Sequence, residues 1–195
     1  MIETFRSPFI FHTVIPNHEE IKRKYLPIIQ STLNANKSLY YMDRKTSDWN
    51  SNVYTSFQHE LSFLRDSELM NSIVWGPVDE LLEEAYEKNM LDRYPTSSSC
   101  NMIWFNYYEP GGFQEVHEHL SIRASFFSGI YLLHNEEPNT TAFSNFNSNP
   151  YLTETKTTEN FPEGTVMIFP TCLLHYVNPV SKPRYTISFN VTSEC

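Results

Sequence analysis

The half of the sequence that follows Cys100 consists of short apolar segments separated by turns. Four segments have the length and composition of β-strands: residues 102–108, 126–133, 165–169 and 185–191. Proline and glycine mark turns between them, in Pro110-Gly111-Gly112 and Pro162-Glu163-Gly164. Short strands joined by turns predict an antiparallel sandwich or jelly roll. The sequence contains no G-x-G-x-x-G or Walker motif, so it does not predict a nucleotide-binding α/β fold.

The first half of the sequence carries helical patterns instead. The clearest predicts a helix over about residues 77–91, with one apolar face made of Val78, Leu81, Leu82, Ala85, Tyr86 and Met90. A second helix is expected to begin near Asn17, and Pro27 predicts that it is kinked or starts later. A third, weaker pattern covers residues 56–71. Helices followed by strands indicate an α+β fold in which the helices pack on one sheet.

Composition and charge limit the range of functions. The chain has 195 residues, 40% hydrophobic and 15% aromatic, so we expect a single domain, residues 1–195, with a sizeable core. The net charge of −9 disfavours nonspecific binding to nucleic acid or to an anionic membrane. The sequence has no apolar stretch long enough for a membrane span and no secretory signal. Three cysteines without CxxC spacing favour the reducing cytoplasm.

Three histidines form the strongest candidate site. His117 and His119 are two residues apart, and on an extended strand such residues point to the same face. His175 follows the apolar run VMIFP, where a strand is expected to end, and is the best third ligand. Three such ligands leave open positions on a metal, but neutral imidazole suits iron, zinc, copper and nickel alike. An H-x-H pair by itself is more often a pair of surface histidines, so the pair alone is a weak signal.

The segment RYTISFN, residues 184–190, predicts a strand with one polar face. Its polar side chains share one side of the strand: Arg184, Thr186, Ser188 and Asn190. If that side faces a cavity, Arg184 offers two parallel hydrogen bonds to a carboxylate, and a Ser or Thr hydroxyl adds a third. The alternative is an edge strand with a solvated arginine. A dicarboxylate bound beside a metal would account for both Arg184 and the histidines.

Five motifs, in order along the chain, resemble the 2-oxoglutarate/Fe(II)-dependent dioxygenase superfamily, in particular its prolyl-4-hydroxylase-like branch. They are WFNYYEPGG, HEH, SGIYLL, PEGTVMIFPTCLLHYVNPV and RYTISFN, and they cover roughly residues 101–192. Within this branch the sequence is most similar to short oxygenases of marine bacteria and their phages. The order of the motifs and the spacing between His175 and Arg184 both agree with the superfamily.

The resemblance implies a double-stranded β-helix, the jelly roll of cupins, with residues 1–100 as a helical buttress and first strands and residues 101–192 as the metal-binding core. It implies an enzyme that hydroxylates a peptide or a small molecule with O2 and converts 2-oxoglutarate to succinate and carbon dioxide. A cytoplasmic location, in the host if the chain is viral, and a homodimer are further expectations.

The resemblance also assigns roles to residues. Fe(II) would be held by His117, His119 and His175. Arg184 matches the residue that binds the distal carboxylate of 2-oxoglutarate, and Ser188 matches a hydroxyl that assists it. Tyr108 lies near a tyrosine that contacts the same cosubstrate in many members.

Two positions depart from the pattern of the superfamily. His119 stands where an aspartate is usual, which leaves the site more cationic, and Glu118 is the alternative ligand although its side chain is expected on the opposite face. Leu132 stands where a second tyrosine is frequent. A cupin-like three-His metalloenzyme that does not use 2-oxoglutarate therefore stays open, as does a non-catalytic binding or structural protein. A zinc hydrolase of the H-x-H-x-D-H type is disfavoured by Ser121 and Ile122.

Overall fold

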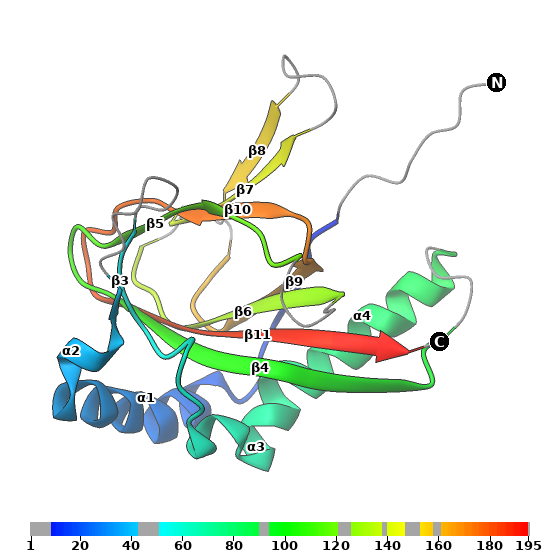
Figure 1. Ribbon diagram of the computed structural model, residues 1–195. Helices are drawn as coiled ribbons and strands as arrows, with labels where there is room; N and C mark the ends of the chain where they lie inside the picture. The colour runs from blue at the N-terminus through cyan, green and yellow to red at the C-terminus, as the bar shows by residue number, and fades with distance from the viewer. Residues whose placement is uncertain are drawn as a thin grey trace.

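The computed structural model describes residues 9–42, 51–89, 94–120, 126–137, 140–146, 153–157 and 161–194. Its strands form one antiparallel sheet that curls over into two layers (Figure 1). The strand order is β1-β9-β6-β11-β4-β3-β5-β10-β7-β8, and β2 pairs with β3. The predicted α+β jelly roll is therefore confirmed.

Two layers of strands face each other. The first contains β1 (Phe11–Val14), β9 (Thr165–Pro170), β6 (Phe127–His134), β11 (Arg184–Glu194) and β4 (Ser97–Tyr108). The second contains β5 (Phe113–His117), β10 (Leu174–Val177), β7 (Thr141–Phe146) and β8 (Thr153–Thr157). The layers are joined by β3 (Ser51–Thr55), which pairs with both β4 and β5, and β2 (Tyr41–Met42) lies at its side. All four strands predicted from the sequence are present.

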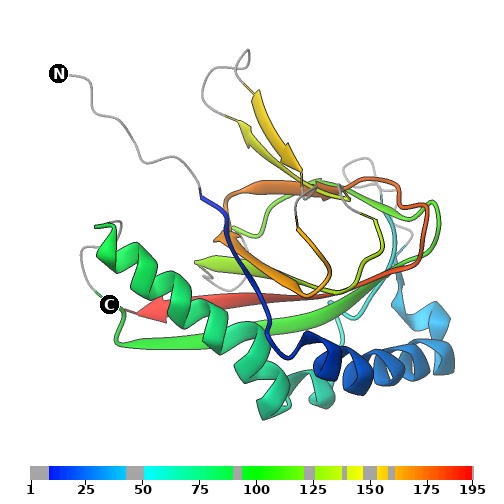
Figure 2. The same ribbon diagram turned by 180° about the vertical axis from the view of Figure 1, so that it is seen from behind.

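Helices cover the outer face of the first layer, as Figures 1 and 2 show from opposite sides. The two long ones are α1 (His18–Ala35) and α4 (Gly76–Glu87). Every fourth residue of α1 is buried against the sheet: Ile21, Tyr25, Ile29 and Leu33. From α4 the core receives Val78, Leu81 and Leu82. The predicted packing of helices on one sheet is confirmed, although residues 90 and 91 of the helix predicted over residues 77–91 lie outside the described residues.

The helix expected near Asn17 begins at His18 and continues through Pro27, because its continuous buried face outweighs the hydrogen bond that proline cannot donate. One of the other helix predictions is wrong. The segment 56–71 is not one helix: it contains a 3-10 turn at Ser62–Arg65 and the short α3 (Ser67–Met70). A π-helical turn, Asn71–Trp75, then leads into α4. The short α2 (Lys37–Tyr40) follows α1. None of the described helices is long and apolar enough to cross a membrane.

Strand β11 has one apolar face and one polar face, and both are buried. Its apolar side chains pack under the helices, namely Tyr185, Ile187, Phe189 and Val191. Its polar side chains are buried on the other face, between the layers: Arg184, Thr186, Ser188 and Asn190. Gly129 on the neighbouring β6 has no side chain because a Cβ there would lie 2.0 Å from the Phe189 ring. The predicted polar face of this strand therefore points into the jelly roll.

Candidate metal centre

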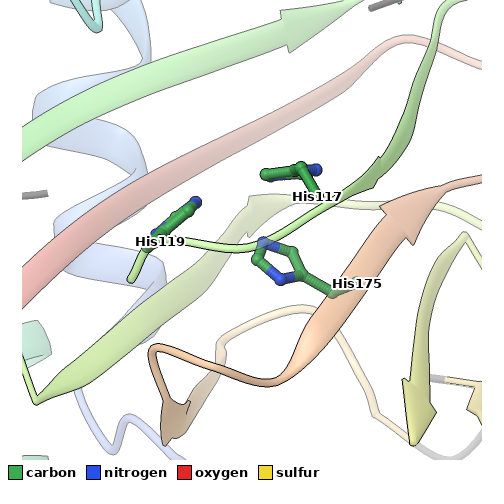
Figure 3. Close-up of side chains that lie close together, drawn as sticks. All are labelled: His117, His119 and His175. Atoms are coloured by element: carbon green, nitrogen blue, oxygen red, sulfur yellow. The ribbon is translucent and has the colours of Figure 1, made fainter. Parts of the chain in front are cut away.

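The three predicted histidines come together between the layers (Figure 3). His117 ends β5 and is directly paired with His175 of β10, while His119 lies two residues beyond the end of β5. Each offers a ring nitrogen, and these three atoms lie within 4.8 Å of one another. The ring centroids are 4.1 Å apart for His117 and His175 and 5.0 Å apart for His119 and His175. The H-x-H spacing and the pairing of β5 with β10 thus bring together three side chains that could hold one metal ion.

Each of the three rings is held through its Nδ1 atom. Backbone carbonyls two residues earlier lie 2.8 Å from Nδ1 of His117 and 3.1 Å from Nδ1 of His175. A carbonyl oxygen only accepts, so Nδ1 donates and Nε2 keeps its lone pair in both rings. For His119, the oxygens of Ser128 and Asn190 lie 2.8 and 3.0 Å from Nδ1. This pattern leaves one nitrogen per ring for a metal.

Burial keeps these histidines neutral. It lowers the pKa of His117 to about 4, with a further contribution from the nearby His119. Burial also lowers the pKa of His175 well below its ordinary value, aided by the other two rings, and it lowers that of His119. A neutral imidazole is the form that binds a metal. The site is therefore ready to accept a cation at neutral pH.

Glu118, the alternative ligand, is not part of this group. Its carboxylate accepts a hydrogen bond from the backbone N–H of Leu120, just beyond it in the chain. The three-donor group instead contains His119, which is buried and whose ring lies 5.7 Å from that of Trp104. The geometry thus favours the histidine over the glutamate.

Arg184 is the largest fully buried side chain and is only 2% exposed. Its guanidinium donates hydrogen bonds to Asn135 Oδ1 at 3.0 Å and to Thr141 Oγ1 at 2.5 Å. The ring of Tyr108 lies 5.3 Å from its Cζ. Among the described residues no carboxylate pairs with it, and burial lowers its pKa to about 10. A buried charge of this kind is normally paired, so Arg184 is a strong candidate for binding an anion.

Strand geometry places Arg184 near the histidines. Tyr108, beside the guanidinium, donates a hydrogen bond to Gln114, which precedes His117 by three residues on β5. Thr141, which accepts from Arg184, is paired with Val177, two residues after His175. Two to three strand residues span roughly 7–10 Å. A small dicarboxylate could therefore reach from Arg184 to a metal held by the histidines.

The other predicted contacts lie on the same interior face. Ser188 is buried and accepts a hydrogen bond of 3.1 Å from the side-chain amide of Asn106. Tyr108 is fully buried, and burial raises its pKa to about 12, with Arg184 acting in the opposite direction. The sequence predicted no role for Asn106, nor for Asn135 and Thr141, which accept hydrogen bonds from Arg184. Asn106 stands inside the motif WFNYYEPGG, which was a usable signal, whereas Asn135 and Thr141 carried none.

A second group of side chains has three possible ligand atoms within 4.8 Å of one another. Its members are His18, Glu19 and Glu163. It is on the helical side of the first layer, where α1 meets the turn before β9. The ammonium of Lys22 forms an ion pair with Glu163 there. A cation of the protein itself therefore already neutralises this carboxylate.

Comparison with known proteins gives similarity in structure only. No family model and no curated protein sequence matches the chain. A prolyl-4-hydroxylase of Pseudomonas putida has a TM-score of 0.53 at 10% identity, with 94% of this chain and 92% of that chain covered. A viral collagen prolyl hydroxylase from Paramecium bursaria Chlorella virus-1, solved with 2-oxoglutarate, has a TM-score of 0.52 at 14% identity, with 96% and 97% covered.

A third similar structure is an epimerase and not a prolyl hydroxylase. The non-haem α-ketoglutarate-dependent epimerase SnoN from nogalamycin biosynthesis has a TM-score of 0.65 at 10% identity, with 95% of this chain and 78% of that chain covered. Identities this low establish the fold and leave activity open. The chain therefore has the jelly-roll fold of the 2-oxoglutarate/Fe(II) oxygenases, among them the prolyl-4-hydroxylase-like enzymes that its sequence motifs resemble.

Proposed function

We propose that this protein is a non-haem Fe(II)/2-oxoglutarate-dependent oxygenase that hydroxylates a peptide or a small molecule and forms succinate and carbon dioxide. The observation that carries the proposal is the position of Arg184. Its guanidinium is buried, has no carboxylate partner among the described residues, and lies within reach of three converging neutral histidines. A metal and a dicarboxylate would satisfy both features together.

The three histidines fit an iron(II) ion. Three imidazole nitrogens on one side of a metal leave open positions, as in non-haem iron oxygenases, where two histidines and a carboxylate are usual. His117, His119 and His175 would hold the ion, and bound iron would supply the activation of O2 at the expense of 2-oxoglutarate. Phe143 and Phe169 pack beside His175, with ring centroids 6.1 and 4.9 Å from it, and keep water from that side.

The remaining polar residues would orient 2-oxoglutarate. Arg184 would donate to the distal carboxylate while Asn135 and Thr141 hold the guanidinium in place. Ser188 and Tyr108 are proposed as further contacts, since both are buried on the same side of the sheet. The dianion would offset charge at both ends, one carboxylate against Arg184 and the other against the metal. This matters more here than with an aspartate ligand, because three imidazoles leave the charge of the ion uncompensated.

Thermal unfolding with Mn(II), which does not turn over, tests the proposal. With Mn(II) present, 2-oxoglutarate at about 100 times its dissociation constant should stabilise the protein by about 2.7 kcal/mol, or roughly 5–10 °C. Arg184→Met should keep the response to Mn(II) and lose the response to 2-oxoglutarate. Arg23→Met, which changes an exposed arginine of α1, is the matched control and should respond as the wild type does.

Succinate formation under air with Fe(II) is the second measurement. Succinate from wild type, and none from Arg184→Met, would support the oxygenase. A protein that binds metal but neither responds to 2-oxoglutarate nor forms succinate would instead be a cupin-like three-His metalloenzyme, which the absence of a carboxylate from the ligand group favours. A peptide or small-molecule substrate, a homodimer, a cytoplasmic location and the single-domain organisation stay predictions.

A further inference from the structure

His119 differs from the other two histidines in what holds its ring. His117 and His175 are held by backbone carbonyls, whereas the Nδ1 of His119 faces two side chains. Ser128 Oγ lies 2.8 Å away and Asn190 Oδ1 lies 3.0 Å away, and Ser128 donates a 2.8 Å hydrogen bond to the same Asn190 oxygen. Ser128 is 1% and Asn190 0% exposed, so water does not compete for these bonds.

These contacts select one tautomer of His119. The amide oxygen of Asn190 only accepts hydrogen bonds. Ser128 uses its one proton on that oxygen, so it can only accept from His119. Both atoms in contact with Nδ1 are then acceptors, and the proton of the neutral ring must lie on Nδ1. The lone pair of Nε2 is thereby left for a metal.

The position of the ring proton depends on the orientation of the Asn190 amide. With Oδ1 facing His119, the amide nitrogen is the one buried side-chain polar atom without a hydrogen-bond partner among the described residues. Leaving a buried donor without a partner destabilises a fold. The reverse orientation would aim an N–H group at Nδ1 of His119 and move the ring proton to Nε2, where it would block a metal. The tautomer of His119 is therefore the property that distinguishes the two orientations.

We infer that Asn190 and Ser128 are positioning residues that fix the tautomer and orientation of His119 for metal binding. The inference rests on the proposed metal site and extends it to residues with no assigned role. An aspartate, usual at position 119, needs no such device, because a carboxylate has no tautomers. An imidazole in the wrong tautomer must first move its proton, which weakens its use as a ligand.

Two measurements test this, neither of which needs turnover. The first is the tautomer of His119 in the metal-free protein, read from the nitrogen shifts of ¹⁵N-histidine by NMR. Wild type should carry the proton on Nδ1. In Asn190→Leu, the Ser128 hydroxyl loses its acceptor and turns to donate to Nδ1, so the proton should move to Nε2. Asn190→Asp and Ser128→Ala each keep an acceptor at Nδ1 and should keep the wild-type tautomer.

The second measurement is the affinity for Mn(II) or Co(II) by calorimetry without 2-oxoglutarate. Asn190→Leu should bind about 10–100-fold more weakly, the range typical of lost partners behind a metal ligand. Asn190→Asp should restore binding to at least the wild-type level. Thr186→Val, on the same face of β11 but without contact to a histidine, is the matched control and should bind as the wild type does.

The outcomes are distinguishable from those of the proposed function. A proton on Nε2 in wild type, or an unchanged tautomer and affinity in Asn190→Leu, would overturn the inference. Should that variant not fold, loss of the Nδ1 proton in either Asn190→Asp or Ser128→Ala would overturn it equally. Metal binding that follows the tautomer, but without any response to 2-oxoglutarate, would support the inference and remove the oxygenase proposal alone.

Discussion

Two groups of histidine side chains in this molecule differ in how their charges are balanced. The metal group, His117, His119 and His175, contains three donor atoms and no charged side chain. The second group, called the joint group, consists of Glu163 and the side chains around it, Lys22, His18 and His134. The carboxylate of Glu163 is paired with Lys22 and accepts a hydrogen bond of 2.7 Å from the backbone N–H of Asn135. It also accepts hydrogen bonds from the two histidines. The first group is arranged to receive a cation, and the second already contains one.

The difference separates a candidate metal site from a group that joins three elements of the fold. The joint group connects α1, through His18 and Lys22, to the end of β6 at His134 and to the turn before β9. His18 also meets the buried hydroxyl of Tyr131 at 2.7 Å. Burial acts to raise the pKa of Glu163, but the hydrogen bonds from Lys22, Asn135 and His18 outweigh it and hold the pKa at about 2. Similar residue types are therefore paired with a cation of the protein in one place and left without a charged partner in the other.

The largest expected effect is on metal binding. If it is not observed, the distinction between the metal group and the joint group is wrong. His175→Ala removes a fully buried donor and should lower the affinity for Mn(II) by at least about 100-fold, since even partners behind a ligand change affinity 10–100-fold. His18→Ala changes the joint group and should leave the affinity unchanged. Calorimetry on both proteins decides it: loss of metal in His18→Ala but not in His175→Ala would mean that the joint group binds the ion.

The second effect is on stability and concerns the joint group. Glu163→Ala should lower the free energy of unfolding by roughly 3 kcal/mol, because the lowered pKa of this carboxylate reflects about that much favourable interaction. For a chain of this length the melting temperature should fall by roughly 6–12 °C. Glu136→Gln is the matched control, as its side chain is 50% exposed in the same region. A Glu163 variant as stable as the control would show that the joint is dispensable.

The sequence predicted that His117, His119 and His175 come together, but it gave no sign of the joint group. H-x-H spacing on a strand, followed by a histidine after an apolar run, is a local pattern, and the pairing of β5 with β10 needed only the fold to complete it. The two faces of β11 were predicted for the same reason, since alternation along one strand is visible in the sequence. Local periodicity was thus enough to place the main elements of the candidate site.

What the sequence could not predict are contacts between distant segments. Glu163 meets His18 and Lys22 across more than 140 residues, and the pairing depends on how α1 crosses the turn before β9. Asn135 and Thr141, which hold Arg184, lie in and beside a loop that carries no periodic signal. Pro27 left open whether α1 starts near Asn17 or after the proline, and burial of a whole helix face, which the local rule does not include, decided for the early start.

The third effect separates the groups by pH in the metal-free protein. The pKa of His117 is lowered to about 4, so between pH 6.5 and 4 the unfolded chain takes up a proton that the folded chain refuses. The free energy of unfolding should therefore decrease as the pH is lowered from 6.5 to 4, by about 1.4 kcal/mol per pH unit for this residue. The pKa of Glu163 is also lowered, so its contribution is complete above pH 4.5 and is lost between 4.5 and 2.

Urea unfolding in the presence of a chelator measures both windows. His117→Gln should reduce the slope in the upper window, to which His119 and His175 also contribute, and Glu163→Gln should flatten the lower window. Mn(II) in place of the chelator should extend the upper window below pH 4, because the bound metal keeps the same nitrogens unprotonated at lower pH. If Glu163→Gln altered the upper window instead, the two groups would be coupled and the comparison would need to be abandoned.

The smallest expected effect lies at the rim of the joint group. Lys182 and Glu136 form an ion pair of 2.9 Å, and their side chains are 54% and 50% exposed. Solvent screens such a pair, so Lys182→Ala should not measurably change the melting temperature. Lys22→Met removes the ammonium inside the group, where Lys22 and Glu163 are only 23% and 22% exposed, and should lower it. Equal changes in melting temperature would mean that the joint group contributes to stability through net charge alone. A larger change for Lys22→Met would assign that contribution to the buried carboxylate and the donors packed around it.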